Sequence, residues 1–127
     1  MTRAQAAIEF AGRALIAGLF VAGAVQKLID PSGAVALLVL AGLPGWLVWP
    51  ALVFSGLAGL GLLAGIAARP LGLALAAYCI ATSYFHYLMG DAWQMTIVAK
   101  NWTIAGGCLL LAAHGAGPWR LGRGRLP

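Results

Sequence analysis

Charged side chains are scarce in this chain of 127 residues. Lys, Arg, Asp and Glu together make up 9% of it, only three residues are acidic, and apolar residues make up 62%. Because a soluble domain carries about 25% charged residues, this chain has too few charges to cover a surface that faces water. The scarcity of charge excludes an ordinary soluble domain, and the long apolar runs place the protein in the membrane class.

The sequence also lacks the motifs of the common catalytic and metal sites. It has two cysteines, Cys79 and Cys108, but no CxxC pair, no zinc spacing, no HExxH motif and no Gly-rich phosphate loop. Both cysteines lie within apolar runs, which favours small buried packing residues over a redox dithiol. We therefore expect no metal site and no intrinsic cofactor, and the pattern identifies no catalytic residue.

Basic residues are few and scattered, although the net charge is +5. Their scatter argues against nucleic-acid binding, and we interpret them as determinants of membrane topology. One side of the predicted membrane domain carries Arg3, Arg13, Arg69, Arg120, Arg123 and Arg125. The other side carries Lys27, Lys100, Asp30 and Asp91. The excess of Lys and Arg on the first side predicts that it is cytoplasmic, so both termini are expected in the cytoplasm.

Four apolar segments each approach the ~20 residues that cross a bilayer. They cover about residues 6–28, 47–68, 71–89 and 93–114. Between the first two, "AVALLVLAG" is too short to cross, which predicts a short interfacial or re-entrant helix. Arg69 and Pro70 are expected to form a tight turn between the second and third spans. The sequence thus predicts an all-α, integral membrane four-helix bundle over residues 1–117 and a basic, irregular cytoplasmic tail over 118–127.

Two charged residues fall on one face of the first span. Glu9 and Arg13 lie four residues apart, with the acid first, which is the favourable order for an ion pair on a helix. We therefore expect a structural ion pair near the cytoplasmic end of this helix.

Several polar residues are predicted to lie at one depth inside the membrane. The helical rise puts Lys100 only ~21 Å from His114, whereas the hydrocarbon core is ~30 Å thick. Lys100 and Asn101 are therefore expected within the outer half of the membrane. The same measure brings these residues to a similar level: Lys27, Ser55, His86, Gln26, Ser83 and Tyr87.

This polar layer has two interpretations. In the first, the two lysines reach the membrane interface and pair with Asp30 and Asp91, while the tryptophans form an aromatic belt. In the second, the layer is a ligand site in which His86 bonds a quinone carbonyl and aromatic side chains pack against the ring. The ligand-binding candidates are His86, Lys100, Asn101, Lys27, Ser55, Asp91, Tyr87 and Trp102.

Three stretches of the chain resemble the DoxX family of small four-helix membrane proteins. "GRALIAGLFVAGAVQKLIDPSG" resembles the opening of the family, "GLAGLGLLAGIAARP" its second helix and "KNWTIAGGCLLLAAHGAG" its final helix. The resemblance covers roughly residues 12–117 and implies a four-helix bundle linked to quinone or thiosulfate oxidoreductases. Family members often carry a glutamate in the second helix where this chain has Ser55, a departure that bears on any mechanism needing that carboxylate.

Two functions follow from the resemblance and the polar layer. The first is a bacterial inner-membrane subunit of a quinone-linked oxidoreductase system, with quinone or another small ligand in the outer half of the bundle. The alternative is a non-catalytic subunit that anchors or scaffolds a larger membrane complex. Either way we expect an accessory subunit rather than a complete enzyme. Its expected partners are the lipid bilayer, other membrane or redox-complex subunits, or further copies of this chain.

Overall fold

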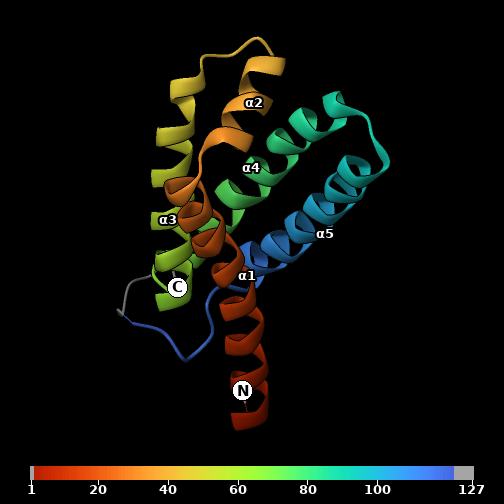
Figure 1. Cartoon of the computed structure of the whole chain (residues 1–127). Helices are drawn as coiled ribbons and strands as arrows, with labels where there is room; N and C mark the ends of the chain where they lie inside the picture. The colour runs from red at the N-terminus through yellow and green to blue at the C-terminus, as the bar shows by residue number, and fades with distance from the viewer. Residues whose placement is uncertain (1, 122–127) are drawn as a thin grey trace.

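The computed structural model describes residues 2–121, which are helical without any strand. The elements are α1 (Arg3–Ile29), α2 (Ser32–Leu40), the 3-10 helix η1 (Gly45–Leu47), α3 (Val48–Ala64), α4 (Ala68–Met89) and α5 (Ala92–His114). Four helical segments are long and apolar enough to cross a membrane: α1, η1 with α3, α4, and α5. The prediction of an all-α membrane bundle is confirmed, and a short helix, α2, lies between the first two spans (Figure 1).

The turn between α3 and α4 lies earlier than the sequence predicted. It is made by residues 65–67, where Gly65 and Ala67 adopt the left-handed conformation with φ of 79° and 51°. The amide of Ile66 donates to the carbonyl of Gly61, which with the left-handed Gly65 forms the Schellman motif that often ends a helix. The prediction of a turn at Arg69 and Pro70 is wrong, because both residues belong to the first turn of α4. Proline is tolerated there, since the amides of a first turn have no intrahelical partner.

The long helices pack as two pairs. α1 lies along α3 and α4 lies along α5, and these two interfaces are far more extensive than any contact between the pairs. The pairs meet mainly through α3 and α4, and α2 adds contacts to η1 and α4. Figure 1 shows the α4–α5 hairpin tilting away from α1 and α3 toward the α4–α5 turn.

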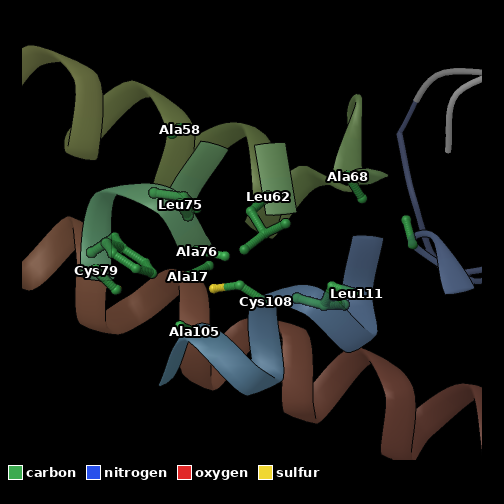
Figure 2. Close-up of a cluster of buried hydrophobic side chains, with 12 residues drawn as sticks. Ala17, Ala58, Leu62, Ala68, Leu75, Ala76, Cys79, Ala105, Cys108 and Leu111 are labelled. Carbon is green, nitrogen blue, oxygen red and sulfur yellow. The ribbon is translucent and has the colours of Figure 1, made fainter. Parts of the chain in front are cut away.

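The core between the pairs is rich in small side chains, which pack around a few larger ones such as Leu62 and Leu75. Ala17, Ala58, Ala76 and Ala105 pack there from all four long helices, and Figure 2 shows the thiol of Cys108 among them. Small residues let helix backbones approach closely, which is the main source of helix association in lipid. The backbones of α4 and α5 come close at Gly72, where an added Cβ would lie 2.7 Å from the carbonyl oxygen of Cys108.

Arg13 is the largest polar side chain in the interior, with an exposed fraction of 1%. Its Nη1 donates to the carbonyl oxygens of Leu62 and Leu63, each at 2.7 Å, and its Nη2 donates to the carbonyl of Trp119. The last carbonyls of a helix lack intrahelical partners and form the negative end of its dipole, so a cation satisfies both demands. The expected pairing with Glu9 is therefore wrong: the guanidinium binds the end of α3, and the Glu9 carboxylate lies beside Gly117.

Arg69 plays the same part in the second helix pair. Its Nη1 donates to the carbonyl of Ala113 at 2.6 Å and its Nη2 to that of His114 at 3.3 Å, at the end of α5. Each pair thus has an arginine from its first helix bound to the carboxyl end of its second helix.

The start of the tail packs back onto the bundle. Residues 118–121 form no helix, the amide of Leu121 donates to the carbonyl of Ala64 at 2.7 Å, and the ring of Trp119 lies 5.8 Å from that of Phe10. The remainder of the predicted irregular tail, residues 122–127, lies outside the described residues.

Gly72 in α4 and Gly106 in α5 allow a matched test of how closely these two helices pack. We expect Gly72→Ala to lower the free energy of unfolding by about 1–3 kcal/mol, because the methyl group collides with the α5 backbone. Gly106→Ala meets no atom within 4 Å, so it should be neutral or stabilise by up to about 1 kcal/mol. Unfolding in mixed micelles, followed by circular dichroism, measures both values. Equal effects of the two substitutions would contradict this packing.

The role of Arg13 predicts a second difference in stability. Arg13→Gln should lower the free energy of unfolding by about 2–4 kcal/mol, because it removes charge-assisted hydrogen bonds to the carbonyls of Leu62, Leu63 and Trp119. Arg3→Gln is the matched control, since Arg3 is an exposed arginine in the first turn of the same helix. The same micelle titration measures both variants, and a loss below about 0.5 kcal/mol for Arg13→Gln would rule out its role as a helix cap.

Candidate functional site

A cavity of about 590 Å³ lies where the two helix pairs diverge. All four long helices line it, and α2 with the loop before η1 adds a further wall. Leucines form much of the lining from α2, the loop and η1, including Leu37, Leu38, Leu43 and Leu47. The cavity therefore combines an apolar wall with polar side chains contributed by the four spans.

The cavity brings together five of the eight residues predicted to bind a ligand. They are Lys27 from α1, Ser55 from α3, His86 from α4, and Lys100 and Asn101 from α5. Helical rise placed these residues at one depth, and the structure adds that they border a common space. Gln26, which was assigned to the same layer, lines the cavity as well.

The other three predicted residues lie elsewhere. Asp91 is the N-cap of α5 and accepts a hydrogen bond of 2.8 Å from the amide of Gln94. Tyr87 and Trp102 have exposed fractions of 61% and 55% and are absent from the cavity lining. Aromatic side chains do line the cavity, but they are Phe20, Tyr78 and Phe85, with Phe20 and Tyr78 packed edge to face at 6.5 Å.

The two aspartates bind backbone amides rather than lysines. The carboxylate of Asp30 accepts from the hydroxyl of Ser32 at 2.7 Å and from its amide at 3.1 Å, and these bonds lower the pKa of Asp30. Short Asp side chains readily bond nearby amides at helix starts, and Asp91 does the same at α5. The expected pairing of Asp30 and Asp91 with the two lysines is not found within residues 2–121.

Lys27 turns back along its own helix. Its Nζ lies 3.9 Å from the position that a Cβ would occupy at Gly23, and Gly23 also lines the cavity. Helical side chains lean toward the N-terminus, and the missing side chain of Gly23 leaves room for the ammonium group. The ammonium group of Lys27 thus points toward the start of α1, and it lies beside the cavity.

His86 is held by a residue that sequence reasoning missed. Its Nδ1 lies 2.5 Å from Oε1 of Gln94. Because that amide oxygen only accepts, Nδ1 carries the hydrogen, and Nε2 of the neutral ring keeps a free lone pair. The signal was available: in a tight helical hairpin, residues equally distant from the turn face each other, and His86 and Gln94 are each four residues from Gly90.

A family model described as DoxX matches residues 8–88, which is more than half of the chain. The chain belongs to the DoxX family. The resemblance drawn from the sequence is thus confirmed. No curated protein and no solved structure matches this DoxX chain.

Ser55 replaces the carboxylate that the resemblance led us to expect in this DoxX protein. It is buried, and its Oγ donates to the carbonyl of Ala51 at 2.9 Å within α3. Its hydroxyl oxygen remains able to accept one hydrogen bond. The α3 wall therefore contributes no negative charge to the cavity.

Both cysteines of this DoxX chain are free and buried. The faces of α4 and α5 that carry Cys79 and Cys108 meet in the core, where both thiols pack with alanine and leucine side chains. Within residues 2–121, no group of three His, Cys, Asp or Glu side chains is arranged to hold a metal ion. The polar residues that line the cavity, besides the thiol of Cys79, are Gln26, Lys27, Asp30, Ser55, Tyr78, Thr82, His86, Lys100 and Asn101.

Proposed function

We propose that this DoxX protein is a membrane subunit of a quinone-linked oxidoreductase system and that its cavity binds the quinone ring. The observation that carries the proposal is a cavity with aromatic and leucine walls on which polar groups from four helices converge. Its volume of about 590 Å³ falls in the range of small-molecule sites. A flat ring is expected to pack between the Phe20–Tyr78 side and the α2 leucines.

His86 supplies the proton chemistry in this proposal. With Nδ1–H bonded to Gln94, the free Nε2 accepts a hydrogen bond, and then the proton, from a hydroquinone hydroxyl. The protonated ring donates from Nε2 to a quinone carbonyl in the reverse direction. Lys100 or Asn101 donates to the second carbonyl. A partner subunit takes the two electrons when hydroquinone is oxidised and supplies them when quinone is reduced, and the second proton is exchanged with solvent, so the protein acts as an accessory subunit.

The arrangement of charges also supports an orientation in the bacterial inner membrane. Arg13 and Arg120 lie beside Gly65 at the end of α3, Arg69 lies at the end of α5, and the two lysines line the cavity toward the opposite end of the bundle. The positive-inside rule assigns the arginine end to the cytoplasm. The cavity then belongs to the outer half of the membrane.

The orientation predicts where a reporter fused after Pro127 is active. A cytoplasm-specific reporter should be active there, and an export-dependent reporter should be silent, because four spans return the chain to its starting side. Fusion of the same pair after Gly90, in the α4–α5 turn, is the internal control and should give the opposite result. A periplasmic signal at Pro127 would overturn the assignment.

The quinone proposal is tested on the purified chain in lipid. Solvent extraction and mass spectrometry should recover quinone, and His86→Ala and Lys100→Ala should each lower the amount about tenfold, because each removes a hydrogen bond to a carbonyl. His114→Ala is the matched control, since His114 is an exposed histidine at the other end of α5.

Equal recovery of quinone from all three variants would eliminate the proposed site. A stable complex that co-purifies with other subunits and contains no quinone would favour the anchoring role instead.

A further inference from the structure

The cavity carries an excess of positive charge. The chain has only two lysines, Lys27 and Lys100, and both line the cavity, where Asp30 is the one carboxylate in the lining. Asp30 is bonded to the hydroxyl and amide of Ser32. Lining His86 adds a further positive charge whenever its ring is protonated.

A neutral ligand would leave this charge uncompensated. Charged groups at membrane depth are unfavourable unless they pair or are hydrated. A quinone carbonyl accepts a hydrogen bond from an ammonium group, but it does not neutralise it. A ligand with a negatively charged oxygen accepts the hydrogen bond and also neutralises the ammonium charge. Hydrogen bonds between oppositely charged groups are stronger than those between neutral groups.

The apolar part of the cavity lining indicates that the ligand also has an apolar portion. Leu37, Leu38, Leu43 and Leu47 form an apolar wall from α2, the following loop and η1, with Val48 at the start of α3. Such a wall excludes a small hydrated anion, because it offers no hydrogen bonds for the displaced water shell. It fits a hydrocarbon chain or ring.

We propose that the cavity selects an amphiphilic anion, whose negative oxygen binds the ammonium groups of Lys27 and Lys100 while its apolar body lies against α2 and η1. The inference rests on the proposed function only for the location of the ligand. An acyl-chain carboxylate and a quinone with an ionised ring hydroxyl share this chemistry.

The test compares charged and neutral probes of matched shape. The full chain is placed in nanodiscs of zwitterionic lipid and treated with an amine-acylating reagent, and mass spectrometry follows Lys27 and Lys100. One pair of probes is dodecanoate and dodecanol, and the other is an alkyl hydroxynaphthoquinone, ionised at neutral pH, and its methyl ether. We expect the anionic member of each pair to protect both lysines at about a tenfold lower concentration than the neutral member.

Substitutions of Lys27 and Lys100 test whether these two residues cause the preference for anionic probes. Binding of the anionic probes to Lys27→Gln and Lys100→Gln, measured by displacement of a radiolabelled probe, should weaken about tenfold, while neutral probes change less than about twofold. Lys27→Arg and Lys100→Arg should recover most of the affinity. Arg3→Gln, which loses the same charge at the far end of α1, should bind like the parent protein.

Equal protection by charged and neutral probes would overturn the inference, as would an equal loss in Arg3→Gln. The probe comparison needs no variant, so it holds even for a substitution that prevents folding. If dodecanoate binds and no quinone does, the inference stands and the quinone proposal fails. If both naphthoquinones bind equally, the quinone proposal stands and the inference fails.

Discussion

The buried guanidinium of Arg13 connects three parts of the chain that are far apart in sequence. It starts in α1, binds the final carbonyls of α3 and reaches the tail at Trp119. Other carbonyls at the end of α3 accept from the amides of Ile66 and Leu121, and Arg13 adds the bonds to Leu62 and Leu63. Arg69 fixes α5 to α4 in the same manner. Each arginine thus joins the two helices of one pair at the end of the bundle where α3 and α5 finish, and the bond to Trp119, which follows α5, links the two pairs there. Toward the other end the two pairs separate (Figure 1).

That separation determines where a ligand can bind. At the arginine end, alanines, Gly72 and Cys108 bring the helix backbones into contact. Toward the other end, the side chains between the pairs become polar, the pairs diverge, and α2 covers the opening with leucines. The site is therefore a consequence of the same two helix interfaces that stabilise the fold, and its polar groups lie on regular helices rather than on loops.

The sequence predicted the parts of this arrangement that depend on one helix at a time. Hydropathy identified the four spans, and helical rise placed Lys27, Ser55, His86 and Lys100 at one depth. The sequence did not predict which hydrogen-bonding or ion-pairing partner each charged side chain would take. Asp30 and Asp91 were assigned to lysines because of their opposite charge, but neighbouring amides at helix starts lie closer and require no ordering of a long side chain. Arg13 was assigned to Glu9 because the two lie four residues apart on one helix. The carbonyls that Arg13 binds belong to residues 49 and 50 positions further along the chain, and no local sequence pattern relates them to Arg13. Tyr87 and Trp102 were assigned to the site from helical rise, but rise alone does not tell which way a side chain points, and both lie outside the cavity lining.

The division into helix pairs has a consequence for how the protein can diversify. α5 contacts α4 extensively and the rest of the bundle little, and it lies beyond residues 8–88, the segment by which the family is recognised. Lys100 and Asn101, however, are both on α5. Substitutions along this one helix would change what the cavity accepts while leaving the rest of the scaffold and its family signature intact. Under the proposed function, part of what determines ligand choice in this chain therefore lies outside the segment that identifies its family.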